Sequence, residues 1–355
     1  MEKLPQSMAA VDIKGGHGPA SALVASELPV PVAGDGQVVI RVFAAGINRP
    51  DVFQRMGYYP PPPGAPATLG LEVSGEIVAA SGRWKLGDRV VALLGGGGYA
   101  EYVVADANHV LPHPETLDAI SAAALPETVF TVFANVFEDG KLRAGQTLLV
   151  HGANSGIGTT AIQMAKAAGA TVIATARGPD KVKAALDLGA DVAIDVKADT
   201  IGGKVKSVLG LGADAPGGTT SGSFAEIANA HGGVDVILDM VGGDYFAGNL
   251  QALKPHGRII YIAGLSGMEI TVPIMALMAK RAVITGSTLR SRTSEEKSAL
   301  AKRVEEVVWP WIAEGKLRPQ IDSTFPLAEA AAAHERMESG SHGGKIVLTV
   351  AGPGK

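Results

Sequence analysis

The sequence predicts an α/β protein with a doubly wound parallel sheet and a second, β-rich domain. Three observations support this fold class. Strands alternate with helices in the middle of the chain, a glycine-rich turn joins the first of these strands to its helix, and short strands broken by Gly and Pro precede them. With 355 residues, the chain is also too long for one ordinary core, so two domains are expected.

The composition is that of a compact protein with many tight turns. Apolar residues make up 46% of the chain, which also holds 46 glycines, and this is typical of an α/β enzyme rather than a disordered protein. The net charge of −4 provides no basic footprint for nucleic acid. The sequence has no cysteine, which excludes disulfides, thiol nucleophiles and thiolate metal ligands.

The chain also lacks the segments that direct a protein to a membrane or out of the cell. Its first ten residues have no apolar region of the kind found in secretory signals. No uninterrupted apolar stretch reaches the roughly 20 residues that a membrane-spanning helix needs. We therefore expect a soluble, cytoplasmic protein.

The first part of the chain, residues 8–110, is predicted to be rich in strands and loops. Apolar and polar residues alternate over 37–43 and 99–104, which predicts two strands. The run YYPPPP at 58–63 cannot be helical, because each proline removes a backbone donor and restricts φ. Nothing here alternates between strand and helix, so this part does not belong to the parallel sheet.

The central part shows the alternation that a parallel sheet requires. Strands are predicted over 147–151, 171–175, 192–194, 234–238, 258–262 and 282–285, and helices over 156–168 and 180–188. Strands that alternate with helices form a parallel sheet covered on both faces. We expect 282–285 to be the last strand of this sheet, with an exposed edge that favours a homodimer.

The carboxyl-terminal part departs from this rhythm, with a helix over 294–314 and a strand over 345–350. We expect it to complete the first domain, so that residues 1–133 and 288–355 form one domain and residues 134–287 the other. The stretch 198–222 is too rich in glycine for a regular element. It is interpreted as a mobile surface insertion in the central domain.

The strongest chemical signal is HGANSGIG at residues 151–158, between a predicted strand and a predicted helix. Free NH groups and the dipole of a helix start favour an anion, and small residues allow a pyrophosphate to approach. Ala153 and Ser155 stand where a GxGxxG motif has its first two glycines, and Gly156, Ile157 and Gly158 complete the turn. The position predicts dinucleotide binding; a merely structural tight turn is the alternative.

The end of the second strand indicates which dinucleotide is bound. NAD-specific folds place an acidic residue there, on the ribose diol. This sequence has Arg177 and, four residues later, Lys181. Both are in range of a 2′-phosphate, which predicts NADPH as the cofactor. The alternative is that both are solvated charges that open a helix.

Several motifs follow one another in an order that is far more specific than any one of them. They are AAGINRPD (44–51), RMG (55–57), LGLEVSG (69–75), GDRV (87–90), ILDMVGG (237–243) and GGKIVL (343–348). Together they resemble the medium-chain dehydrogenase/reductase superfamily, in its zinc-free quinone oxidoreductase (zeta-crystallin-like) branch. TLRSR (288–292) is most similar to the stress-induced NADPH:quinone oxidoreductases within that branch.

The resemblance implies a Rossmann NADPH-binding domain, a GroES-like substrate domain and hydride transfer from NADPH to a quinone. Zinc-dependent relatives have cysteine and histidine at the positions of Asn48 and Leu71, so we expect no metal. The histidines at positions 17, 109, 113 and 151 have no ligand spacing, and surface or capping roles are expected for them. Without a metal, alcohol oxidation lacks its electrophile.

The resemblance also implies roles for individual residues. Asn48 and Tyr59 match positions that line the nicotinamide and the substrate, and the Tyr59 hydroxyl is expected to donate to the acceptor's carbonyl oxygen. The alternative for Tyr59 is a structural role as a rigid aromatic residue beside the prolines. Its neighbour Tyr58 is a second candidate for the same substrate contact. Asp51 and Glu72 are expected to be hydrogen-bonded scaffold. The remaining cofactor contacts are assigned to Thr131, Gly264, Leu265, Ser266 and Lys345, with helix packing as the alternative for Thr131.

Other functions compete with quinone reduction. Short-chain dehydrogenases share the glycine spacing of 152–158, but no tyrosine here has a lysine four residues later. Reduction of activated C=C bonds in enones or enoyl thioesters uses the same hydride and differs only in the substrate pocket and a protonation step. A protein that holds NADPH without catalysis is the non-enzymatic alternative. We expect a small electrophilic substrate and no nucleic-acid partner.

Overall fold

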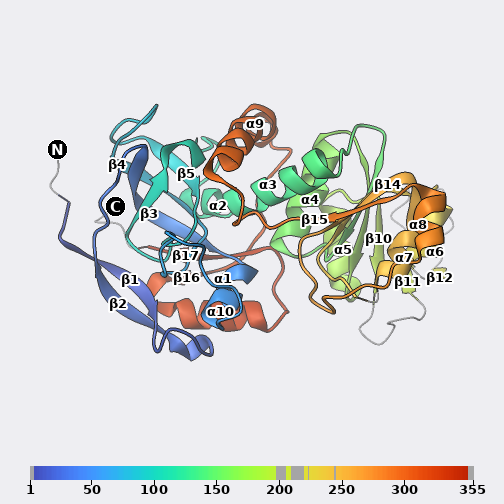
Figure 1. Cartoon of the computed structure of the whole chain (residues 1–355), viewed down its shortest axis with the longest axis horizontal. Coiled ribbons are helices and arrows are strands. Elements are labelled where there is room, and N and C mark those ends of the chain that lie inside the picture. The colour runs from blue at the N-terminus through green and yellow to red at the C-terminus, as the bar shows by residue number, and fades with distance from the viewer. Residues whose placement is uncertain (1–3, 197–204, 209–219, 223, 244, 351–355) are drawn as a thin grey trace. The chain divides into compact units, whose positions relative to one another are not determined.

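The computed structural model describes residues 4–196, 205–208, 220–222, 224–243 and 245–350. The chain divides into two compact units (Figure 1), which are described separately. Unit 1 contains residues 1–130 and 289–355, and unit 2 contains residues 131–288. The sequence placed these boundaries after residues 133 and 287.

Unit 2 is built on a twisted sheet whose strands confirm the predicted alternation. These are β8 (Thr147–His151), β9 (Thr171–Ala176), β10 (Val192–Asp195), β13 (Val234–Asp239), β14 (Leu253–Tyr261) and β15 (Val283–Gly286). They are parallel and lie in the order β10-β9-β8-β13-β14-β15. This is the 3-2-1-4-5-6 order of a doubly wound dinucleotide-binding fold, with its switch point between β8 and β13.

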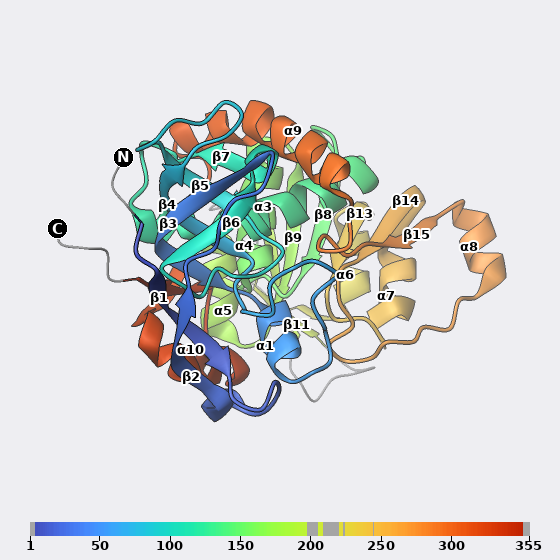
Figure 2. The ribbon, with the colours of Figure 1, turned by 60° about the vertical axis from the view of Figure 1, so that its left-hand side comes forward.

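Helices cover both faces of this sheet (Figure 2). They are α4 (Gly156–Ala167), α5 (Pro179–Asp187), α6 (Phe224–Ala230), α7 (Tyr245–Ala252) and α8 (Ile274–Lys280). Phe224 of α6 and Phe246 of α7 share a core with Leu149 of β8. Since neighbouring strand residues point to opposite faces, Leu148 and Val150 face the other side, where α4 packs on β8 and β9. The doubly wound fold class is therefore confirmed.

Two short strands extend this sheet beyond β10. β11 (Val205–Val208) pairs antiparallel with β10, and β12 (Thr220–Gly222) pairs antiparallel with β11. The prediction that 198–222 contains no regular element is wrong at these strands, because an available sheet edge supplies backbone partners that a glycine-rich segment cannot supply locally. The rest of that stretch lies outside the described residues.

Unit 1 contains a second, mainly antiparallel sheet. Its strands are β3 (Gln37–Ile47), β4 (Glu72–Ala79), β5 (Arg89–Leu93), β6 (Tyr102–Asp106), β7 (Val110–Pro112), β16 (Ile321–Pro326) and β17 (Lys345–Thr349). They lie in the order β16-β17-β3-β4-β5-β7, and β6 also pairs with β3. β17 runs antiparallel to β3 with Ile346 opposite Ile47, so the carboxyl-terminal strand returns to the first domain as predicted. A separate hairpin joins β1 (Ser7–Ile13) and β2 (Leu23–Pro29).

The helices of unit 1 flank this sheet. They are α1 (Arg49–Arg55), α2 (Ala119–Ala123), α9 (Ser294–Ala313) and α10 (Ala330–Glu338), with short 3₁₀ turns η1 (Ala20–Ala22), η2 (Ala107–His109) and η4 (Leu327–Glu329). α9 begins at a capping box in which Thr293 accepts from the Glu296 NH and the Glu296 side chain accepts from the Thr293 NH. The first unit boundary falls within α3 (Pro126–Val132), which continues into the π-helical segment η3 (Phe133–Asp139).

Among the residues that the structure describes, no helix combines the length and the hydropathy that a membrane-spanning segment needs.

Candidate functional site

The glycine-rich turn between β8 and α4 is held in one shape by its own side chain. Ser155 caps α4: its Oγ accepts from the Gly158 NH at 3.0 Å and donates to the Gly152 carbonyl at 2.8 Å. Gly152 has a φ of +71°, which a residue with a Cβ rarely adopts. The Ala153 NH donates to the Thr175 carbonyl of β9 at 2.9 Å. The turn is therefore fixed before any ligand binds.

Gly158 allows this turn to lie directly against its helix. A Cβ on Gly158 would come within 2.3 Å of the Gly152 carbonyl oxygen and 2.7 Å of the Ala153 carbonyl carbon. The first NH groups of α4, starting at Gly156 and Ile157, have no intrahelical partner and form the positive end of the helix dipole. The turn lies at the carboxyl end of β8, at the switch point of the sheet. These features fit a dinucleotide pyrophosphate.

A buried polar network ties the carboxyl ends of three strands together beside this turn. His151 Nδ1 lies 2.9 Å from Thr175 Oγ1, and its Nε2 lies 2.7 Å from Asn249 Oδ1. Asn249 Nδ2 donates to Asp239 Oδ2 at 2.6 Å. Burial lowers the pKa of His151, although Asp239 opposes this. The expected surface or capping role of His151 is therefore wrong: the side chain is fully buried, because β8 is a central strand.

The network also positions the loop that the resemblance assigns to the nicotinamide. Asp239 Oδ1 accepts from the NH groups of Val241 and Gly242. The Ser266 NH and Oγ both donate to the Val241 carbonyl, at 2.8 and 3.0 Å. Gly264 packs against Gly242 so closely that a Cβ on Gly242 would lie 2.9 Å from its Cα. Leu265 is 57% exposed.

The residues assigned to the 2′-phosphate lie at the end of β9 and on α5. Arg177 is exposed directly after β9, and Lys181 is partly buried on α5. The nearby carboxylate of Asp195 accepts from the Gly178 NH at 2.8 Å, so it holds the turn between β9 and α5. Burial raises the pKa of Tyr245, and the charge of the nearby Arg177 opposes this rise.

Tyr245 is a candidate cofactor residue that sequence reasoning missed. The sequence has no aromatic residue after β10 to stack on an adenine, because Asp195 and Val196 are found there. Tyr245, at the start of α7, is half-buried and lies edge-on to His151 with ring centroids 4.9 Å apart. It is remote in sequence from that position, so only the fold brings it to this edge of the sheet.

Thr131 lies on α3 and is almost completely buried. Its carbonyl accepts from Asn135 Nδ2 at 2.9 Å, and Asn135 Oδ1 accepts from Ser287 Oγ at 2.8 Å. Thr131 therefore belongs to a buried hydrogen-bonded group in unit 2. Its contact with a cofactor stays a prediction.

Unit 1 contains a closed triangle of buried polar side chains around Asn48. Lys345 Nζ donates to Asn48 Oδ1 at 2.5 Å, to Glu72 Oε1 at 2.6 Å and to the Ile47 carbonyl at 3.1 Å. Asn48 Nδ2 donates to the same Glu72 oxygen at 2.9 Å. Glu72 Oε2 accepts from the Glu127 NH. The Lys345 ammonium, only 4% exposed as a residue, therefore faces Asn48 and Glu72.

Asp51 holds the start of α1, where Asn48 is the cap. Its carboxylate accepts from the Asn48 NH at 2.8 Å and from the Gly70 NH at 3.1 Å. Burial raises the pKa of Asp51 to about 6, against these two hydrogen bonds and the Lys345 charge. Asp51 and Glu72 thus have the hydrogen-bonded scaffold positions that the sequence predicted for them.

The residues around Asn48 do not fit a zinc ion. Among the described residues, no group of His, Asp and Glu side chains is arranged to hold a metal. The two positions that are ligands in zinc-dependent relatives hold Asn48 and Leu71. Of the carboxylates near Asn48, that of Glu72 is bound by the Lys345 ammonium, and that of Asp51 accepts from the backbone NH groups of Asn48 and Gly70. A second cation next to that ammonium would be strongly repelled. No step of the chemistry is therefore assigned to a metal.

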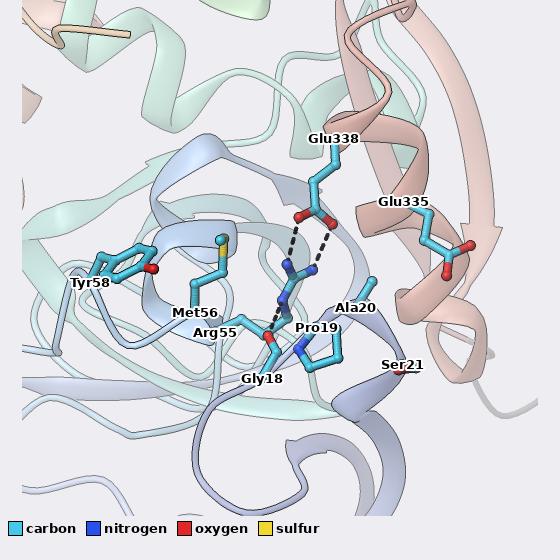
Figure 3. A pocket seen from close by; sticks show the side chains of 9 residues that line it. All are labelled: Gly18, Pro19, Ala20, Ser21, Arg55, Met56, Tyr58, Glu335 and Glu338. Atoms are coloured by element: carbon cyan, nitrogen blue, oxygen red, sulfur yellow. Dashed lines mark hydrogen bonds and ion pairs between the residues drawn. The ribbon is translucent and has the colours of Figure 1, made fainter. Parts of the chain in front are cut away.

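Tyr58 and Tyr59 point to different surroundings. Tyr58 is 75% exposed and lines a surface pocket of about 560 Å³ together with Arg55 and Glu338 (Figure 3). Tyr59 is half-buried beneath the Arg290 guanidinium, whose Cζ lies 5.5 Å from the ring centroid. Burial raises the pKa of Tyr59, and Arg290 opposes this. Of the two, Tyr59 is the less exposed, and its contact with a substrate stays a prediction.

A second buried chain of polar groups lies behind Asp51. Arg55 makes two hydrogen bonds to Glu338, at 2.7 and 3.0 Å, and its Nη1 also lies 3.3 Å from His334 Nδ1. Since an arginine can only donate, His334 Nδ1 accepts and its Nε2–H donates to Tyr99 Oη at 3.0 Å. Burial and the charges of Arg55 and Arg49 lower the pKa of His334 to about 3.

This shift predicts a pH dependence of stability. Between pH 3 and about 6.5, the unfolded His334 binds more protons than the folded one, so the free energy of unfolding falls as the pH falls through this window. The variant His334→Gln does not lose stability in this way, because glutamine does not bind a proton in this pH range. The stability difference between the two proteins should therefore shrink by about 1.4 kcal/mol per pH unit below 6.5. Urea unfolding at several pH values tests this; a constant difference would contradict a buried neutral His334. The contribution of Asp51, whose pKa is about 6, is the same in both proteins and cancels in the difference.

The chain is similar to known proteins along nearly its whole length. The alcohol dehydrogenase GroES-like domain family matches residues 34–115, and the zinc-binding dehydrogenase family matches residues 211–348. The quinone oxidoreductase of Mus musculus is 33% identical over 336 residues, which cover 93% of this chain and 94% of that protein.

Solved structures agree with this similarity. An NAD-dependent alcohol dehydrogenase is 30% identical with a TM-score of 0.79, and the match covers 97% of this chain and 100% of that one. A mycobacterial protein solved in complex with NADPH is 26% identical with a TM-score of 0.79, and the match covers 96% of this chain and 100% of that one. The motif order, the strand order of unit 2 and the full-length similarity show that the chain belongs to the quinone oxidoreductase family of the medium-chain dehydrogenase/reductase superfamily.

Proposed function

We propose that the protein is an NADPH:quinone oxidoreductase that works without a metal. The observation that supports this best is the Lys345 ammonium, which binds Asn48 and Glu72 at the place where zinc-dependent relatives have ligands. An alcohol substrate needs an electrophile to stabilise its alkoxide. A quinone accepts a hydride readily, so its reduction needs mainly proximity and orientation.

The chain's own residues hold and orient the two reactants. The turn from Ala153 to Gly158 holds the pyrophosphate, and the loop from Gly264 to Ser266 with Thr131 borders the nicotinamide. When bound, NADPH supplies the hydride. Asn48 presents an amide whose orientation is set by Lys345 and Glu72. The Tyr59 hydroxyl donates a hydrogen bond to the carbonyl oxygen of the acceptor.

The loss of NADPH and NADH absorbance with a panel of quinones and enones, before and after a chelator, tests the proposal. We expect chelator-resistant quinone reduction with a preference for NADPH. Reduction of enones alone would identify an activated alkene, instead of a quinone, as the substrate. Binding of NADPH without turnover of either class would contradict an enzymatic function.

The preference for NADPH rests on Arg177, which is exposed directly after β9. Arg177→Ser should raise the Kd for NADPH about tenfold, because a charge-assisted hydrogen bond to the 2′-phosphate is lost. The Kd for NADH should not change. Isothermal titration of both cofactors measures this, with Arg143→Ser, an exposed arginine elsewhere in unit 2, as the control. An equal change for both cofactors would contradict the assignment.

We also propose a homodimer formed through the β15 end of the unit 2 sheet. β15 is the last strand of that sheet, and α8, which directly precedes β15 in the chain, packs on the neighbouring strand β14 (Figure 2). No residue of α8 is buried, and it exposes Ile274, Met275 and Met278 by 68%, 75% and 61%. A cluster of large apolar side chains next to an open strand edge is typical of a protein interface.

A charge in this cluster should separate the subunits. We expect light scattering to report a dimer mass for the protein and a monomer mass for Met275→Asp. The melting temperature should be the same for both proteins. Val32→Asp changes an apolar residue of unit 1 that is even more exposed, at 90%, and should leave the dimer intact. A dimer that survives Met275→Asp would place the interface elsewhere.

A further inference from the structure

Arg290 is a buried cation whose hydrogen bonds are incomplete. The residue is 8% exposed. Its Nε and Nη2 both donate to one acceptor, the Gly95 carbonyl, at 3.1 and 2.7 Å. Its Nη1 is buried and has no hydrogen-bond partner among the residues that the structure describes. One edge of the guanidinium is thus held by the Gly95 carbonyl, and the N–H groups of Nη1 have no acceptor among the described residues.

Arg290 keeps its positive charge, because an arginine is not deprotonated in proteins, although its surroundings disfavour that charge. Burial lowers the pKa of Arg290, while Asp51 and Tyr59 act against this. Lys297 Nζ donates to the Arg290 carbonyl at 2.9 Å, so a second cation stands nearby. Burial and Arg290 together lower the pKa of Lys297. An acceptor with negative charge is the partner that this potential favours.

A buried N–H group without an acceptor destabilises the folded protein, and a ligand that accepts from it would remove this cost. Leaving a buried N–H without an acceptor costs about 1–3 kcal/mol, and more for a charged group. Such groups in native proteins call for an explanation, of which a functional role is one. The ring beneath the guanidinium is Tyr59, whose hydroxyl is already assigned to the acceptor's carbonyl oxygen. Arg290 and Tyr59 are therefore direct neighbours, with the guanidinium over the ring.

We propose that Arg290 binds the carbonyl oxygen of the quinone that becomes negative during reduction, with Tyr59 as its neighbour. This inference rests on the proposed function and extends it to a specific electrostatic role. The quinone takes up the hydride of NADPH with its two electrons and becomes a hydroquinone monoanion, and NADP⁺ is left. Arg290 stabilises the new oxyanion until a proton from water completes the hydroquinone. Donors fixed before the reaction act most strongly on such developing charge.

Substitution of Arg290 must separate this role from the support of the Gly95 loop. Arg290→Gln retains an amide donor for the Gly95 carbonyl but loses the charge and Nη1. We expect the single-turnover rate of quinone reduction to fall about 100-fold to 1000-fold, as for other lost oxyanion donors, with KM nearly unchanged. Arg290→Lys should recover part of the rate because it restores the charge.

Arg83→Gln is the matched control. The Arg83 guanidinium also lies over an aromatic ring, with its Cζ 4.5 Å from the centroid of Trp84. Unlike Arg290, it is paired with a carboxylate, that of Glu305. This variant should retain the rate. A rate for Arg290→Gln equal to that of the control, or a rise in KM with no change in the single-turnover rate, would overturn the proposed role.

A binding measurement makes the test independent of turnover. The probe is a dihalogenated phenol that ionises near neutral pH, titrated above the pKa of Asp51, which is about 6. The protein should bind the phenolate more tightly than the phenol, and Arg290→Gln should lose this difference. If the protein reduces no quinone but shows Arg290-dependent phenolate binding, the proposed function fails and the anion site stands. Quinone reduction without any Arg290 dependence would leave the function and remove the site.

Discussion

Gly158→Ala is expected to weaken NADPH binding about 100-fold or more, which corresponds to about 3 kcal/mol. The added Cβ would lie 2.3 Å from the Gly152 carbonyl oxygen and 2.7 Å from two Ala153 atoms, all of them backbone. Backbone cannot rotate away as a side chain can, so the turn must move off the helix. The pyrophosphate would then lose the NH groups of the α4 amino terminus. Titration of NADPH by calorimetry or fluorescence measures the loss.

A matched glycine shows whether the loss is specific to this turn. Gly343 has an ordinary φ and no atom within 4 Å of an added Cβ, so Gly343→Ala should bind NADPH as the unchanged protein does. Gly158→Ala should remain folded, because the strain is confined to one turn of a large sheet. Unchanged NADPH affinity in folded Gly158→Ala would contradict the assignment of the cofactor to this turn.

Lys345→Met is expected to lower the free energy of unfolding by about 3–5 kcal/mol, the usual effect of removing one partner of a buried ion pair. Glu72 is fully buried, and without the ammonium its Oε1 keeps only the Asn48 amide as a partner. Asn48 also loses the donor to its Oδ1. Urea unfolding measures the stability, and steady-state kinetics measures the effect on quinone reduction.

The double variant Glu72→Gln, Lys345→Met separates the charge from the position of Asn48. It removes both charges, so most of the lost stability should return, as for other buried pairs replaced together. The kcat for quinone reduction should be lower than that of the unchanged protein in both variants, because Asn48 Oδ1 then lacks the ammonium donor that sets the orientation of its amide. A double variant as unstable as Lys345→Met would show that packing, and not the unpaired carboxylate, causes the loss. Full recovery of kcat would remove Lys345 from the positioning of Asn48.

Much of unit 2 was predictable from the sequence, because its signals are local. β8 begins and ends where the apolar run 147–151 predicted, and α4 ends one residue before the predicted end at 168. The glycine turn depends on neighbours only a few residues apart, such as the Ser155 cap on Gly158. Local hydrogen bonds and hydrophobic periodicity are what a sequence expresses directly.

The tertiary structure decided the surroundings of the polar residues. The assignment of Lys345 to the cofactor stays a prediction, and the sequence did not show that the antiparallel pairing of β17 with β3 brings its ammonium to Asn48. His151 became a buried link between Thr175 and Asn249, which is 98 positions away in sequence. Strands β11 and β12 formed because β10 offered them an edge.

The sequence by itself determined the fold class, the order of the elements, the glycine turn and the absence of thiolate ligands. Only the tertiary structure decided which charges meet. Arg290 lies 195 positions from Gly95 in the sequence, and no local pattern shows that one of its donors lacks a partner. The physical reason is that periodicity and capping act over a few residues, whereas the energy of a buried polar group depends on all of its neighbours in space.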